Sequence, residues 1–249
     1  MFIWTEAEQQ ALPLWLAVIL LVSVLLGVIL RRCPLWARGI PTALVALAVL
    51  FLEILKQRWN AAGPQDPYRY PFHYCSLFVA MFLLAELLGD RMSRIFRPIA
   101  TAMAFVVSVA MYACPDGIIS GACESFGKTF QHTHTMLLHH FIVLYFLLSV
   151  MLRLYRPRLR DALLVGAVGV LYVALALPLA YCLDENYCNL LYSVLEPLEA
   201  FRLERGQAAY TLFLSACLTL GTAFGAALHS ILYKIFLIIF DRRSQDYDE

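Results

Sequence analysis

A histidine and a cysteine, His73 and Cys75, lie where a polar stretch becomes an apolar run, in the sequence PYRYPFHYCSLFVAMFLLAELLG of residues 67–89. A cysteine is a strong nucleophile when a neighbouring base takes its proton. In a regular helix His73, two residues before Cys75, points to a different face. We therefore expect a histidine of another segment, His139, to act as the base for Cys75.

Cys75 lies where a helix is expected to begin. Pro71 is favoured in the first turn of a helix, so Cys75 would lie about one turn inside it. Free backbone amides and the positive end of the helix dipole favour a thiolate there. Residues 71–85 contain no aspartate or glutamate that would oppose one. The alternative is an unreactive cysteine that packs as a small apolar side chain.

Other ionisable or strongly polar side chains are expected at the same depth, at the ends of four apolar runs. Such groups are costly inside a membrane and by default mark functional sites. Besides Cys75 they are Glu53, Lys56, His73, His132, His134, His139, His140, Asp184, Glu185 and Asn186. We predict that they line one polar cavity.

Several of these residues also have simpler interpretations. Glu53 and Lys56, three residues apart, can form a local ion pair on a helix. His132 and His134 fit a solvated loop, and His140 fits the lipid headgroups as well as the interior. None of these interpretations needs a site.

The composition is that of a membrane protein. Of 249 residues 61% are hydrophobic and 15% charged, whereas a soluble chain is about 45–50% apolar and roughly 25% charged. We expect a multi-pass integral protein, in the cell membrane if bacterial, with residues 1–249 as one helical domain. The net charge of +1 and the lack of a basic stripe argue against nucleic acid. The sequence shows no cofactor motif, and its histidines lack the cysteine spacing of a metal site.

A helix that crosses a bilayer needs about 20 mostly apolar residues, because its backbone must be bonded internally. Seven runs come near this length: Leu12–Leu30, Ile40–Leu55, Phe72–Leu88, Ile95–Cys114, Met136–Leu154, Ala162–Cys182 and Tyr210–Phe240. The predicted fold class is all-α, a polytopic membrane bundle of about seven transmembrane helices. Glu6 and Glu8 before the first run indicate a span and not a signal peptide.

Lysine and arginine in the loops predict the orientation. One side of the predicted bundle holds 12 of them in its loops and tail, and the other side holds 6. Because the richer side is normally cytoplasmic, we expect the N-terminus outside and the C-terminus in the cytoplasm. The polar cavity would then lie near the outer leaflet.

Four of the seven cysteines, Cys114, Cys123, Cys182 and Cys188, fall at outer span ends or in outer loops. An oxidising exterior permits disulfides, and 114–123 and 182–188 are the closest pairings in sequence. Free cysteines that pack as small apolar side chains are the alternative.

Four short motifs resemble a known family. FLEILKQ, YPFHYCSLF, LLHHFIVLYF and DENYCNLL, in this order, resemble the YwaF-like integral membrane proteins of bacteria and their animal relative, transmembrane protein 164. The likeness covers the predicted second to sixth spans. Glu53, Lys56, Cys75, His139 and Asn186 match positions of the family's motifs, with His140 next to the histidine slot.

This resemblance implies an acyltransferase that acts on phospholipids through Cys75 with His139 as its base. We expect Cys75 to accept a fatty acyl group as a thioester and to pass it to a lysolipid, with Asn186 or Lys56 stabilising the oxyanion. Transfer to water would make the protein a lipid hydrolase. The alternatives are a small-solute or proton-coupled transporter or binder that uses the same cavity, and a non-catalytic membrane protein.

Overall fold

The computed structural model describes residues 4–62, 70–119 and 121–240. Helices make up all the regular structure in these ranges. They are α1 (Glu6–Leu30), α2 (Leu35–Ala62), the 3-10 turn η1 (Tyr74–Ser76), α3 (Leu77–Glu86), α4 (Asp90–Ala113), α5 (Asp116–Ile119), α6 (Phe130–Met151), α7 (Leu159–Leu183), the 3-10 turn η2 (Tyr187–Asn189), α8 (Glu196–Arg205) and α9 (Gln207–Phe240). The predicted all-α bundle is confirmed.

Within the described ranges, six helices are long and apolar enough to cross a membrane: α1, α2, α4, α6, α7 and α9. The sequence predicted about seven spans, and the third run is the one without a long helix, because the α-helix α3 has only 10 residues. At 1.5 Å per residue it covers about 15 Å of a hydrocarbon core of roughly 30 Å. Before this helix the backbone is extended at His73. After it, Gly89 has a positive φ of 84°, and the chain turns there into α4.

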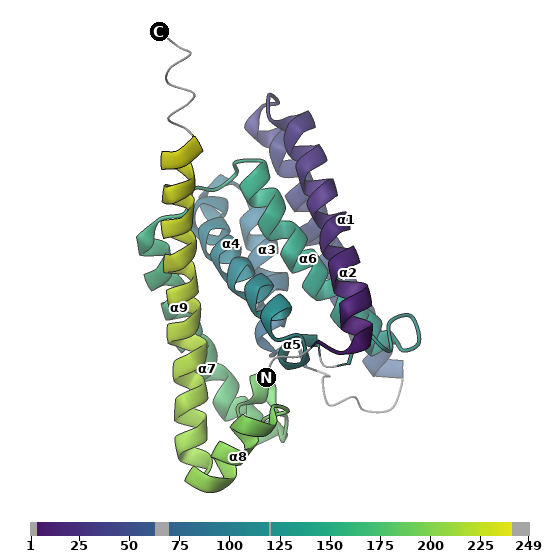
Figure 1. The fold of residues 1–249 in the computed structure, drawn as a ribbon, viewed down its shortest axis with the longest axis vertical. Helices are drawn as coiled ribbons and strands as arrows, with labels where there is room; N and C mark the ends of the chain where they lie inside the picture. Colours follow the sequence, from purple (N-terminus) through teal and green to yellow (C-terminus); the bar gives the residue numbers. More distant parts are fainter. Residues whose placement is uncertain (1–3, 63–69, 120, 241–249) are drawn as a thin grey trace.

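The helices form two connected groups (Figure 1). α7 and α9 lie side by side along one edge, joined at one end by α8, and both contact α4. On the other side α6 packs against α1, α2 and α4, while α3 packs against α2 and α4. The short helix α3 thus buries Phe78, Phe82 and Ala85 against its neighbours, and its position depends on these longer helices.

Close packing at glycine brings the helices near one another. A Cβ atom added to Gly225 of α9 would lie 2.6 Å from Cγ2 of Val106 in α4, and one on Gly169 of α7 would lie 3.1 Å from Cα of Thr219 in α9. The Gly221–Gly225 spacing on α9 is typical of close helix packing, and Gly225 provides the contact.

A buried carboxylate fixes the end of α3. Glu86 accepts hydrogen bonds from Nε (3.0 Å) and Nη2 (2.8 Å) of Arg97 in α4, from the hydroxyl of Tyr145 in α6 (2.7 Å) and from the hydroxyl of Thr42 in α2 (2.8 Å). Its side chain is 1% exposed. Both oxygens are therefore fully used, and one residue connects α3 to three other helices.

The cysteines form no disulfide. All seven, at positions 33, 75, 114, 123, 182, 188 and 217, are free thiols in the structure. The pairings 114–123 and 182–188 are therefore absent, and the alternative of free cysteines holds. Cys123 packs with its sulfur 3.7 Å from the sulfur of Met136, and Cys188 has a separate role described below.

Replacing Glu86 by alanine should destabilise the bundle, because Arg97, whose side chain is only 17% exposed, would lose its counter-charge. Breaking one partner of a buried ion pair costs about 3–5 kcal/mol. Since 1 kcal/mol shifts the Tm by about 2–4 °C in a chain of this size, the Tm in detergent should fall by roughly 6 °C or more. Glu204→Ala, whose side chain is 73% exposed, is the matched control. Equal melting of the two variants would contradict an anchoring role.

Candidate functional site

Cys75 lies in a single 3-10 turn, not one turn inside an α-helix as Pro71 had suggested. The backbone is extended at His73 (φ −65°, ψ 147°), turns through η1 and becomes α-helical only at Leu77. The amide of Ser76 donates to the carbonyl of His73 (2.8 Å) and closes this turn. Cys75 therefore precedes the α-helix by two residues and is only partly buried.

The predicted partner of Cys75 is present. Nε2 of His139 lies 2.9 Å from Sγ of Cys75. On the other side of the ring, Nδ1 of His139 lies 2.8 Å from the carbonyl oxygen of Thr135, one turn earlier in α6. Because a carbonyl can only accept, we assign the proton of the neutral ring to Nδ1. Nε2 then has a free lone pair directed at the thiol.

This arrangement has the geometry of a nucleophile and its base. A hydrogen bond between them and a third group that orients the base are the structural requirements for an activated thiol. His139 is 5% exposed, so water does not compete strongly for its ring. Here the carbonyl of Thr135 takes the orienting role that a carboxylate or amide has in other such sites.

A second thiol, Cys188, supports the turn from the opposite side. Its sulfur accepts the backbone N–H of Tyr74 (3.1 Å) and the hydroxyl of Tyr172 in α7 (3.0 Å). The same hydroxyl lies 2.9 Å from the carbonyl oxygen of Phe72. Burial raises the pKa of the Cys188 thiol, although both hydrogen bonds oppose this, so Cys188 stays protonated and holds the segment that carries Cys75.

The supporting role of Cys188 and Tyr172 is not predicted from the sequence. The position of Cys188 suggests a disulfide or a small apolar side chain, and Tyr172 lies inside the apolar run Ala162–Cys182. A hydroxyl at membrane depth, which needs a hydrogen-bond partner, was the available signal. The left-handed backbone at Cys188 (φ 49°) and Asn189 (φ 60°), which brings this sulfur to Tyr74, has no signature in the sequence.

Glu53 and Lys56, which were predicted to line the site, are both buried on α2. They do not form an ion pair with each other. Oε1 of Glu53 accepts from Nε2 of Gln57 (2.7 Å), and Oε2 lies 3.9 Å from Nε2 of His134. Neither Oε2 of Glu53 nor Nε2 of His134 has a hydrogen-bond partner among the described residues, and both atoms are shielded from solvent. The local Glu53–Lys56 pair is thus ruled out, as is a solvated loop around His134, which lies buried in α6.

Lys56 and His73 also belong to this neighbourhood. Lys56 is 8% exposed, and its charge acts on His73. Burial lowers the pKa of His73 to about 4, and the neighbouring bases Lys56 and His139 act in the same direction. His73 is therefore neutral at pH 7, and its ring packs edge-on against Tyr187 (5.4 Å between centroids).

His140 lies away from this cluster. Its Nδ1 is 2.7 Å from the carbonyl oxygen of Met136, and its ring packs on Trp15 of α1 with 4.7 Å between centroids. It lines an apolar cavity of about 160 Å³ between α1 and α6. His140 thus faces the interior next to α1 and not the sulfur of Cys75.

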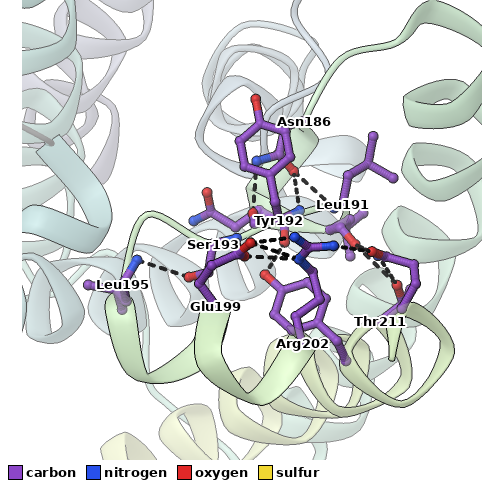
Figure 2. Close-up of polar contacts among 12 residues, drawn as sticks. Asn186, Leu191, Tyr192, Ser193, Leu195, Glu199, Arg202 and Thr211 are labelled. Carbon is purple, nitrogen blue, oxygen red and sulfur yellow. Dashed lines mark hydrogen bonds and ion pairs between the residues drawn. The ribbon is translucent and has the colours of Figure 1, made fainter. Parts of the chain in front are cut away.

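The Asn186 side chain is occupied by its own loop, as Figure 2 shows. Oδ1 accepts from the amides of Leu191 (2.9 Å) and Tyr192 (3.4 Å), and Nδ2 donates to the carbonyl of Tyr192 (2.9 Å). In the same view Glu199 accepts from Arg202 and Ser193, and these bonds lower the pKa of Glu199 to about 2. Asn186 therefore orders the loop that carries Cys188 and does not direct its amide at Cys75.

The model of the TMEM164 family matches residues 4–233, most of the chain. The chain belongs to the TMEM164 family. This confirms the resemblance to transmembrane protein 164, while the likeness to the YwaF-like bacterial proteins stays a prediction. Together with the six long apolar helices, it makes this TMEM164 family member a multi-pass integral membrane protein. No curated protein and no solved structure that was searched matches the chain.

The pairing with His139 should make Cys75 more reactive than Cys188, its neighbour without an imidazole contact. An acyl-like, membrane-soluble electrophile should modify Cys75 at least about tenfold faster, because a positioned base contributes about 10²–10⁴. In His139→Ala the two rates should become similar. Peptide mass spectrometry over time measures both thiols in one sample, and an unchanged Cys75 rate in His139→Ala would contradict the assignment of the base.

Proposed function

We propose that this protein is a membrane-embedded acyltransferase that moves a fatty acyl group between lipids through a thioester on Cys75. The observation that carries the proposal is the 2.9 Å contact between Sγ of Cys75 and Nε2 of His139, with the Nδ1 proton of His139 directed at Thr135. An inert cysteine would not need a base whose second nitrogen is fixed in this way.

In the first half of the reaction, His139 Nε2 takes the thiol proton while the sulfur of Cys75 attacks the ester carbonyl carbon of a phospholipid. The C–S bond forms and the ester C–O bond breaks. The imidazolium returns the proton to the departing alkoxide, which leaves as a lysolipid hydroxyl.

In the second half, His139 takes the proton from the hydroxyl of an acceptor lysolipid. The acceptor oxygen attacks the thioester carbon, the C–S bond breaks, and the proton returns to the sulfur of Cys75. Water in place of the acceptor would give hydrolysis. His139 is the tenth residue of α6, about 14 Å along the helix axis, and this depth limits water and favours transfer.

For the oxyanion of each tetrahedral intermediate, Lys56 is a better candidate than Asn186. The amide of Asn186 already donates to Tyr192, and the backbone N–H of Tyr74 donates to Cys188. The ammonium group of Lys56 is buried and forms no ion pair with Glu53 in the described structure. A fixed cation in a water-poor site stabilises developing negative charge strongly.

A second candidate function rests on Glu53 and His134. Their facing atoms, 3.9 Å apart, are both buried and both lack a hydrogen bond in the part of the chain described. A pair of this kind binds a proton or a hydroxyl-bearing solute well, as a proton-coupled transporter or binder requires. In the acyltransferase the same pair would bind the polar part of the acceptor lipid.

Turnover by variants distinguishes the two candidates. With labelled phospholipid and lysolipid, Cys75→Ser and His139→Ala should each lose about 10²–10⁴-fold in rate, and the double variant should lose little more because the two residues act as a unit. His140→Ala, a buried histidine next in sequence that faces α1, is the matched control and should keep most of the activity. Undiminished turnover by Cys75→Ser would reject the nucleophile and leave the binder.

A further inference from the structure

A cavity of about 380 Å³ lies at the end of the bundle where α1 ends, α2 begins and α6 ends. This end also holds Glu86, and it is opposite to the end from which Cys75 enters. Four arginines line the cavity: Arg31, Arg32, Arg38 and Arg153. Its volume is within the range of about 300–1,000 Å³ that is usual for sites of small ligands.

The positive charge in this cavity is not neutralised by the protein. The lining contains no acidic side chain, and none of the four guanidinium groups forms an ion pair with any carboxylate in the ranges that the structure describes. The cavity therefore concentrates four positive charges and would bind an anion.

Arg38 gives the cavity a fixed donor. One terminal nitrogen, Nη1, donates to the carbonyl oxygen of Leu152 (3.0 Å), which holds the side chain across from α2 to α6. Its Nε is shielded from solvent and is therefore not open to a ligand in the cavity, whereas the guanidinium group as a whole is held in one orientation at the cavity wall.

The backbone around the cavity is shaped for this arrangement. Arg153 ends α6 in a left-handed conformation (φ 52°), and its amide donates to the carbonyl of Val150 (3.1 Å). This turn leaves the carbonyl of Leu152 free for Arg38. Gly27 lets α1 approach, because a Cβ atom there would lie 3.1 Å from Cβ of Met151.

We propose that this cavity binds the phosphate group of an anionic ligand, either the headgroup of an acidic phospholipid or free inorganic phosphate. Planar guanidinium groups match phosphate oxygens in geometry as well as in charge. Basic pockets between transmembrane helices are known to hold phosphorylated lipid headgroups. The simpler explanation is that these arginines only set topology, and it predicts no selectivity for phosphate.

The test uses the purified full chain in neutral detergent, titrated separately with short-chain phosphatidic acid, inorganic phosphate and short-chain phosphatidylcholine. Arg31→Gln/Arg32→Gln removes two exposed guanidinium groups of the cavity. Arg91→Gln/Arg94→Gln removes two exposed ones from the start of α4, outside the cavity. We expect binding of phosphatidic acid, phosphate or both, weakened at least about tenfold in the first variant and unchanged in the second.

Each outcome decides between the sources or against the site. If inorganic phosphate binds and its binding depends on Arg31 and Arg32, a free anion is sufficient. If phosphatidic acid binds and inorganic phosphate does not, the ligand is a lipid headgroup. If neither probe binds, if phosphatidylcholine binds equally well, or if both double variants lose equally, the proposal is wrong. Arg38→Lys, which keeps the charge but loses the planar guanidinium group, should also weaken binding and replaces the first variant if that one does not fold.

Discussion

The four hydrogen bonds accepted by Glu86 fix the position of α3, and the site depends on that position. A helix of 10 residues cannot be placed by the thickness of the bilayer, as longer helices are. Glu86 instead ties it to Thr42, Arg97 and Tyr145 on three different helices. Because both oxygens are used and buried, α3 has one position relative to these helices. Cys75 lies just before the other end of this short helix, so its position is constrained in the same way.

The end of α3 near Cys75 is held by contacts other than those of Glu86. Helix α6 contacts both ends of α3, through His139 at one end and Tyr145 at the other. Cys188 and Tyr172 bind the backbone just before Cys75, while Tyr145 and His139 are six residues apart on α6. The helix whose Tyr145 donates a hydrogen bond to Glu86 therefore also carries the proposed base. A shift of α3 relative to α6 would break the bond to Tyr145 and lengthen the contact between Cys75 and His139 together. Stability of the bundle and geometry of the site are coupled in this way.

The sequence predicted the Cys75–His139 contact because both residues stand where apolar runs begin, and adjacent helices bring such ends to one layer. It also predicted that Glu53, Lys56 and His73 would lie nearby. It could not predict the short third helix, since hydropathy counts apolar residues but does not show that the backbone is extended at His73 and becomes α-helical only at Leu77. Asn186 was assigned from a motif, yet the left-handed residues that follow it turn its amide into the loop. His140 differs from His139 by one position, which on a helix is about 100° of rotation and a different neighbour.

The most direct measurement is peptide mass spectrometry of the protein after incubation with a phospholipid that carries a labelled acyl chain, quenched before any acceptor lipid is added. The account predicts the mass of the acyl group on Cys75, its removal by hydroxylamine as expected of a thioester, and its loss in His139→Ala. Acylation of a different cysteine, with Cys75 unmodified in a protein that turns over substrate, would contradict it.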